Sequence, residues 1–358
     1  MLAKEELIKA LYEGSYERRA DESIEVYEEW HICSDLVAIQ RLMKAIASSD
    51  LIIFSLRKYR GSVFLVCEPS GRHIIRYLWC ERNIRKYYPF HTFSPYVEEF
   101  FKVTKDFVSK YGPNEIRGPL GPCSADVVME LNTVIKRLRC VINGAEFKDE
   151  LNQHVRSSNK NYKSLVGYID SLFKLRSRLL VLRVDFGYKK PEVTKSAREP
   201  VDLYDVKRHR EKLFREVKNK LIAGAFVGYC WKLEYGLSKS YHYHCIIFLD
   251  GSKVREDISL GRMIGELWCE KITSGKGVYY NCNYKKHSYR SCGIGMVSHD
   301  DVEMRCNLLK AASYLTKVEF YIRIALDGVG RCFGRGEMPK LGRRLGRPRK
   351  ITRVGIVI

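Results

Sequence analysis

The sequence predicts an α+β protein, with a helical N-terminal domain followed by an antiparallel-sheet domain that has helices on one face. Three observations lead to this expectation. Apolar residues recur at helical spacing in residues 1–50 and 125–150, and β-rich runs alternate with helical patterns after residue 171. The charge divides as well, because residues 1–170 carry 25 Lys or Arg and 23 Asp or Glu, whereas residues 171–358 carry 38 and 19.

The first half is expected to form a mostly helical accessory domain over residues 1–165. Residues 51–66 contain two short apolar runs, which fit either strands or buried helix pieces, because periodicity does not separate the two. Residues 111–123 are rich in Gly and Pro and predict a loop, and the polar stretch 152–163 predicts a linker. No catalytic constellation is evident in this half.

The second half is expected to form a sheet domain over residues 171–328, followed by a basic tail at 329–358. The predicted elements are a strand at 178–187, a helix at 203–222, a hairpin of 226–234 and 241–249, a helix at 259–270, a short strand at 293–297, and a helix at 301–324. This order favours an antiparallel sheet with helices packed on one face.

Composition narrows the function classes. The start of the chain has acidic residues where a signal peptide needs an apolar run, and no apolar stretch approaches the ~20 residues that span a bilayer. Twelve Cys without a C-x-x-C pair favour reduced core thiols in the cytoplasm over disulfides or a zinc ribbon. The net charge of +21, concentrated in the second half, predicts a polyanionic partner and no membrane association.

A candidate metal site lies on the predicted hairpin. His242 and His244 are two residues apart on a strand, so their side chains share one face. A turn near Ser238 would place Glu234 directly across from His242. Two imidazoles and a carboxylate suit Mg²⁺ or Mn²⁺ if phosphate oxygens complete the shell, and Zn²⁺ is an alternative. The competing interpretation is two histidines on the polar face of a half-buried strand.

A candidate nucleophile lies on the last predicted helix. Tyr314 and Lys317 are three residues apart, so they lie on one helical face and could address the same phosphate. A tyrosine hydroxyl attacks well only when a nearby cation and a polarised phosphate assist it. The alternative is a core tyrosine beside a solvated lysine.

In combination, these motifs resemble the HUH endonucleases, in which His-hydrophobe-His is followed downstream by Tyr-x-x-Lys. More narrowly, residues 175–340 resemble the prophage and inovirus-type replication proteins, also called the YagK/YfjJ C-terminal domain. The resemblance is carried by Trp231-Lys-Leu-Glu-Tyr-Gly, Tyr241-His-Tyr-His, Ile264-Gly-Glu-Leu-Trp, Thr273-x-Gly-x-Gly, Asn281-Cys-Asn, Tyr314-Leu-Thr-Lys and Phe333-Gly-Arg-Gly.

The resemblance implies metal-dependent nicking and rejoining of single-stranded origin DNA, which initiates rolling-circle replication of a phage, prophage or plasmid-like element in a bacterial cytoplasm. His242, His244 and Glu234 would hold the ion. Tyr314 would form a 5′-phosphotyrosine and free a 3′-hydroxyl for a host polymerase, with a host helicase as a further partner, and Lys317 would neutralise the phosphate. Tyr321 is a weaker candidate for a second nucleophile.

Other residues are candidates for supporting roles. Asp185 could orient a metal-binding histidine, or could equally cap the end of a strand. The residues considered for DNA contact, besides Tyr321, are Trp268, Lys276, Arg343, Arg344, Arg347, Arg349 and Lys350. Two alternative functions stay open, namely a non-catalytic DNA-binding regulator of a mobile element and an HUH transposase or relaxase.

Overall fold

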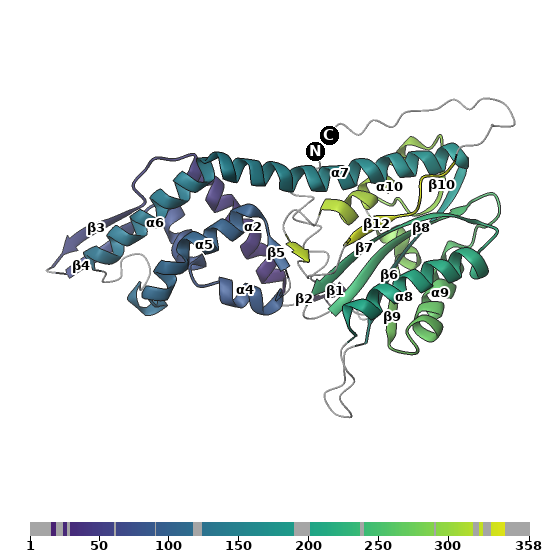
Figure 1. The fold of residues 1–358 in the computed structure, drawn as a ribbon, viewed down its shortest axis with the longest axis horizontal. Coiled ribbons are helices and arrows are strands. Elements are labelled where there is room, and N and C mark those ends of the chain that lie inside the picture. The colour runs from purple at the N-terminus through teal and green to yellow at the C-terminus, as the bar shows by residue number, and fades with distance from the viewer. Residues whose placement is uncertain are drawn as a thin grey trace. The chain divides into compact units, whose positions relative to one another are not determined.

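A computed structural model gives the fold of the chain (Figure 1). It describes residues 16–18, 24–26, 29–60, 62–89, 91–116, 124–189, 201–236, 240–289, 291–317, 322–324 and 331–340. The chain divides into two compact units. We call Ile8–Ser157 with Glu319–Leu326 the helical unit, and Ser158–Val318 with Asp327–Ile358 and Met1–Leu7 the sheet unit.

The helical unit is built around one apolar core. Its elements are β1 (Tyr16–Arg18), β2 (Ile24–Val26), α2 (Glu29–Ala47), β3 (Phe54–Tyr59), β4 (Ser62–Cys67), α3 (Pro69–Tyr77), α4 (Glu81–Tyr87), β5 (His91–Phe93), α5 (Pro95–Lys110), η1 (Pro113–Glu115) and α6 (Ala125–Asn143). The apolar face predicted for α2 lies in this core, where Leu36, Ile39 and Met43 are fully buried. The ambiguous residues 51–66 resolve as strands, since β3 and β4 form an antiparallel hairpin.

Helix α7 (Ala145–Leu175) contributes to both units, and their boundary falls within it at Ser157–Ser158. The boundary between the units thus falls within the stretch 152–163 that the sequence predicts as a linker, and the connection there is helical. Most of its described polar side chains lie at exposed positions of this long helix, although His154 is buried, and polarity alone does not distinguish such a helix from a loop.

The sheet unit contains an antiparallel sheet with strand order β10-β6-β8-β7-β12, and β9 also pairs with β6. Its elements are β6 (Arg178–Tyr188), α8 (Leu203–Glu216), η2 (Val217–Leu221), β7 (Phe226–Gly236), β8 (Ser240–Asp250), α9 (Asp257–Leu267), η3 (Trp268–Ile272), β9 (Gly277–Asn281), η4 (Cys282–Ser288), β10 (Gly295–Ser298), α10 (Val302–Lys317) and β12 (Phe333–Arg335). The predicted class, a helical region followed by an antiparallel-sheet domain, is confirmed.

Helices cover both faces of this sheet, which corrects the expectation of helices on one face only (Figure 1). On one face α7 and α10 pack against Val181, Ile246 and Phe248. On the other face, the Tyr243 hydroxyl donates to the Val206 carbonyl of α8, and the residues of α9 contact β6. The physical reason is visible in β8, whose run Cys-Ile-Ile-Phe-Leu is apolar at every position because both faces are buried.

Two segments differ from their predicted type. The helix expected over 301–324 ends at Lys317, and Ile322–Ile324 instead forms β11, which pairs with β5 of the helical unit. The Gly-rich stretch after Thr273, where no strand was expected, contains β9. The first residue of β9, Gly277, has no room for a side chain, because a Cβ there would lie 2.4 Å from the Thr273 hydroxyl and 2.6 Å from the Trp268 indole.

Candidate metal centre

Three neighbouring strands each place two polar residues on one sheet face, two positions apart. These pairs are Arg183 and Asp185 on β6, Lys232 and Glu234 on β7, and His242 and His244 on β8. The antiparallel register sets Glu234 opposite His242, as the sequence predicts, and sets Asp185 and Lys232 on either side of His244. We call this surface, on the same face as α7 and α10, the metal face.

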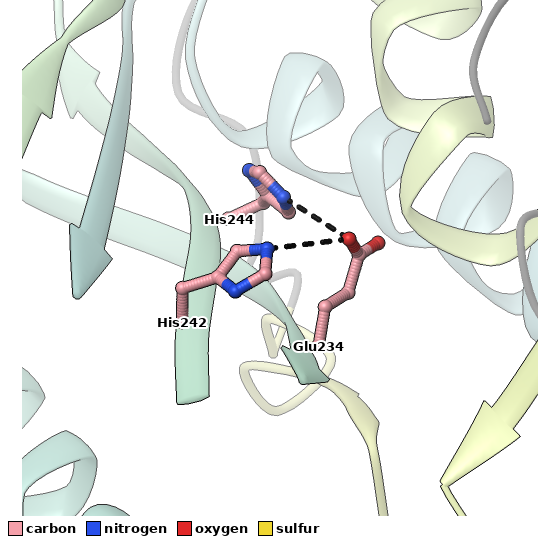
Figure 2. Close-up of side chains that lie close together, drawn as sticks. All are labelled: Glu234, His242 and His244. Atoms are coloured by element: carbon pink, nitrogen blue, oxygen red, sulfur yellow. Dashed lines mark ion pairs between the residues drawn. The ribbon is translucent and has the colours of Figure 1, made fainter. Parts of the chain in front are cut away.

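Glu234, His242 and His244 converge on one point (Figure 2). The Oε2 atom of Glu234 lies 3.5 Å from Nε2 of His242 and 3.3 Å from Nε2 of His244. One ligand atom from each residue fits within a span of 4.8 Å. The three side chains are only 13 to 22% exposed, so the cluster is recessed but still partly accessible to solvent.

The other ring nitrogen of each histidine faces an acceptor. Nδ1 of His244 lies 3.0 Å from Oδ1 of Asp185, and Nδ1 of His242 lies 3.1 Å from the backbone carbonyl of Ser240. Ser240 has a φ of 55°, an uncommon conformation for a residue other than glycine. Both acceptors favour a proton on Nδ1, so that Nε2 is the nitrogen that would bind an ion once it carries no proton.

The charges in the cluster are strongly coupled. Burial alone would raise the pKa of the Asp185 carboxyl, but attraction to His244 and Arg183 outweighs burial and lowers that pKa to about 2. Burial is likewise outweighed at Glu234, where the two imidazoles hold the pKa well below its ordinary value. For His244, burial disfavours the charged ring, yet Asp185 and Glu234 raise its pKa to about 9. The cluster therefore holds two ionised carboxylates that attract a cation.

These residues fit a divalent ion. Two imidazole Nε2 atoms and a carboxylate oxygen form a mixed nitrogen and oxygen donor set that leaves coordination positions for other ligands. Such a set accommodates Mg²⁺ or Mn²⁺ when phosphate oxygens complete the shell, and it also accommodates Zn²⁺. Asp185, which the sequence left between an orienting role and a strand cap, lies within β6 beside His244.

Tyr314 lies on the helix that packs against the metal face. Helix α10 contacts β7 and β10, and its residues Leu308, Ala312 and Leu315 are buried against the sheet. The Tyr314 side chain is half-buried. Lys317 is the last residue of α10, and its side chain lies outside the described part of the structure.

The residues considered for DNA contact have different outcomes. Trp268 is fully buried on the opposite face of the sheet, where its ring packs against Phe186 and its Nε1 donates to the Gly187 carbonyl. It is a core residue, so the suggestion of a DNA contact is corrected. Lys276 is exposed. Tyr321, Arg343, Arg344, Arg347, Arg349 and Lys350 lie outside the described residues.

Two neighbours of the cluster were not found from the sequence. Arg183 lies with its Nε 3.8 Å from Oδ1 of Asp185, and the Lys232 side chain is buried opposite His244. The alternation that selected His242 and His244 would have found both, because charged residues two apart in an otherwise apolar strand mark the same face. The Ser240 carbonyl is a backbone group and has no sequence signal.

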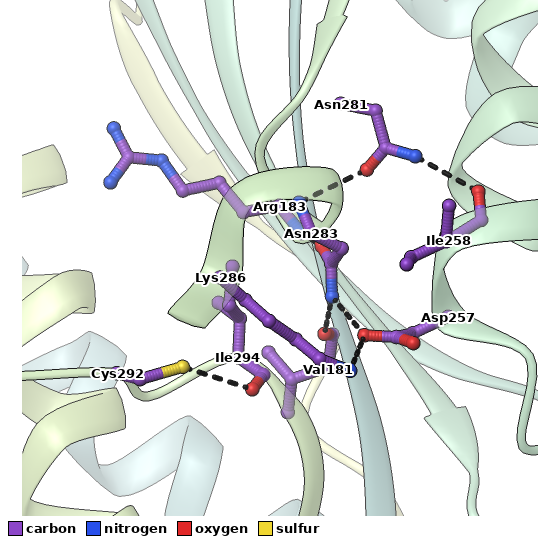
Figure 3. A network of polar contacts seen from close by, with 9 residues as sticks. All are labelled: Val181, Arg183, Asp257, Ile258, Asn281, Asn283, Lys286, Cys292 and Ile294. Carbon is purple, nitrogen blue, oxygen red and sulfur yellow. Dashed lines mark hydrogen bonds and ion pairs between the residues drawn. The ribbon is translucent and has the colours of Figure 1, made fainter. Parts of the chain in front are cut away.

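A buried asparagine fixes strand β6 next to the cluster (Figure 3). Oδ1 of Asn283 accepts from the backbone N–H of Arg183 at 2.8 Å, and its Nδ2 donates to the Val181 carbonyl at 3.0 Å and to Asp257 at 2.9 Å. Lys286 also pairs with Asp257 at 2.7 Å. The network ties η4 and α9 to the strand that carries Asp185.

Replacing Asn283 by Ala is expected to lower the free energy of unfolding of the sheet unit by about 3 kcal/mol, because three buried hydrogen bonds are lost and their partners stay buried. Urea unfolding of the full chain, followed by tryptophan fluorescence to which Trp231 and Trp268 of the sheet unit contribute, measures the shift. Asn143→Ala is the control, since this exposed residue makes one peripheral bond of 3.4 Å. Equal shifts for the two variants would contradict the structural role.

Residues 145–336 match the model of the YagK/YfjJ C-terminal domain family. The chain belongs to this family, and the matched span begins at the first residue of α7 and ends directly after β12. The resemblance to the YagK/YfjJ C-terminal domain is thus confirmed, and the matched span begins earlier than the predicted residue 175. No curated protein and no solved structure gives a match. Among the described residues, no helix is both long and apolar enough to span a bilayer.

Proposed function

We propose that the sheet unit is an HUH-type endonuclease, which nicks and rejoins single-stranded DNA through a tyrosine to initiate rolling-circle replication of a phage, prophage or plasmid-like element. One observation carries the proposal. Two histidine Nε2 atoms converge on the Glu234 carboxylate, on the sheet face against which the Tyr314 helix packs. The excess of basic residues after residue 171 supports a nucleic-acid substrate.

The residues of the cluster have distinct parts in this proposal. Glu234, His242 and His244 hold the ion, while Asp185 and the Ser240 carbonyl keep both imidazoles in the metal-binding tautomer. A divalent ion bound there supplies Lewis-acid stabilisation of the negative charge that develops on a phosphate. Arg183 and the buried Lys232 add positive charge on the same face.

Tyr314 is the proposed nucleophile. Its phenol oxygen forms a bond to the scissile phosphorus, and the bond between phosphorus and the 3′ oxygen breaks. The phenolic proton passes to solvent, and the departing 3′ oxygen takes up a proton to become a hydroxyl that a polymerase can extend. Attack by that hydroxyl on the phosphotyrosine reverses the step and rejoins the strand. Lys317 is proposed to neutralise the phosphate.

A selection for covalent capture tests this function without knowledge of the target sequence. The full chain is incubated with Mn²⁺ and a single-stranded library that has a random centre and a label at its 3′ end. A 5′-phosphotyrosine leaves the labelled segment attached to the protein after denaturation, and sequencing reports the site. Enrichment of one sequence that needs Mn²⁺ is expected. Recovery equal to that in EDTA would contradict the proposal and favour a DNA-binding regulator.

A further inference from the structure

Two rows of side chains cross the metal face on the four strands β9, β6, β8 and β7. One row consists of Tyr280, Asp185, His244 and Lys232, and the other of Val278, Gly187, His242 and Glu234. The histidine cluster occupies the β8 and β7 end of both rows. The β9 end lies two strand spacings from β8, about 10 Å away.

The β9 end of these rows is apolar and exposed. Tyr280 is 50% exposed and Val278 is 42% exposed, although both belong to a strand of the central sheet. Gly187 lies between Val278 and His242, because a Cβ built on it would lie 3.4 Å from Val278 and 3.9 Å from the His242 Cβ. Since glycine has no side chain, no side chain of β6 stands between these two residues. We call Val278, Gly187 and Tyr280 the β9 platform.

The β9 platform rests on a fixed support. On the far side of β9, the ring of Tyr279 fits against Gly265 of α9, where an added Cβ would lie 2.1 Å from the ring. At the end of the strand, Nδ2 of Asn281 donates to the carbonyl of Ile258 at 2.9 Å (Figure 3). The Tyr280 side chain is therefore held on the metal face by a strand of the sheet and not by a loop.

Two cations lie at one end of the β9 platform. Lys189 directly follows β6, Lys276 directly precedes β9, and the backbone N–H of Lys189 donates to the carbonyl of Lys276. Both side chains are exposed. Tyr280 follows Lys276 by four residues, about 13 Å along β9. An exposed aromatic ring with ammonium groups at this spacing matches the chemistry of a single-stranded nucleic acid, in which one base stacks on the ring while lysines meet phosphates further along the strand.

We infer that the β9 platform binds one unpaired nucleobase of the DNA strand next to the nick, by stacking on Tyr280, with Lys189 and Lys276 contacting phosphates further along the strand. This inference rests on the proposed function for its choice of ligand. It adds a position where the base itself is held, about 10 Å from the cluster that would hold the scissile phosphate. Stacking accepts every base, so the site fixes the path of the strand more than its sequence.

Fluorescence anisotropy of a labelled thymidine homopolymer of about 20 nucleotides tests the inference, in EDTA so that no nicking occurs. Tyr280→Ala is expected to weaken binding about 10-fold, whereas Tyr280→Phe, which keeps the ring, stays within about 2-fold. A polymer of abasic deoxyribose phosphates, which lacks the bases, completes a double-mutant cycle in which the ring and the base are removed separately and together. It should bind wild type and Tyr280→Ala equally, because the base is already missing.

Tyr204→Ala is the matched control, since Tyr204 is 74% exposed on α8, which covers the opposite face. The inference is overturned if Tyr280→Ala binds the homopolymer as tightly as wild type, or loses equal affinity for both polymers. Because the assay needs neither metal nor Tyr314, it is independent of covalent capture. If DNA is captured covalently but Tyr280→Ala leaves binding unchanged, only the β9 platform is refuted. If Tyr280→Ala weakens binding but no DNA is captured, only the nickase is refuted.

Discussion

Replacing Tyr314 by Phe is expected to reduce nicking by at least about 10³-fold, because the variant lacks the oxygen that attacks the phosphorus. Single-stranded DNA affinity should change by less than about 3-fold, since the ring and the surrounding α10 packing are retained. The measurement pairs a denaturing-gel nicking assay on the captured sequence with anisotropy on the same oligonucleotide.

Two further variants make the Tyr314 result specific. Tyr204→Phe removes an exposed hydroxyl from α8 and should leave nicking unchanged. Tyr321→Phe reports on a second nucleophile, and it should leave the first cleavage intact if Tyr314 acts alone. Nicking by Tyr314→Phe at the wild-type rate would exclude Tyr314 as the nucleophile, whatever the other variants show.

Replacing Glu234 by Gln is expected to weaken Mn²⁺ binding by more than about 100-fold, because the variant keeps the shape but loses the negative charge shared by both imidazoles. Mn²⁺ should therefore raise the thermal unfolding midpoint of wild type and not that of the variant. Nicking in Mn²⁺ should fall in parallel, while DNA affinity measured in EDTA stays close to that of wild type.

Glu270→Gln is the matched control for this charge change, because Glu270 is exposed in η3, away from the metal face. Its response to Mn²⁺ should equal that of wild type. A stabilisation by Mn²⁺ that survives in Glu234→Gln would place the ion elsewhere. Loss of folding in the metal-free variant, seen by circular dichroism, would instead give Glu234 a structural role.

The register of the site could be predicted from the sequence because a hairpin leaves few choices. Once the turn is placed near Ser238, the antiparallel pairing sets Glu234 opposite His242, and alternation directs His244 to the same face. The structure adds the contacts between strands that are not neighbours in the sequence. Asp185 reaches His244 only because β6 lies beside β8, and the two strands are far apart in the chain.

Other features had a signal that was open to two interpretations. The continuous apolar run of β8 indicates a strand buried on both faces, whereas the order of the predicted elements favours helices on one face only. No element was predicted for the Gly-rich stretch after Thr273, although Gly277 is needed in β9 because Trp268 and Thr273 lie too close for a side chain. Trp268 illustrates the same limit, since an aromatic residue can stack on a base or fill a core.

Mass spectrometry of the covalent adduct decides whether Tyr314 attacks DNA beside the histidine cluster. After nuclease and trypsin digestion, Tyr314 lies in the peptide Ala311–Lys317, whose sequence Ala-Ala-Ser-Tyr-Leu-Thr-Lys contains no other tyrosine. We expect a 5′-phosphonucleotide on Tyr314 of this peptide, formed with Mn²⁺ and absent in EDTA. An adduct on Tyr321 or any other residue, or DNA binding without any adduct, would exclude Tyr314 as the nucleophile.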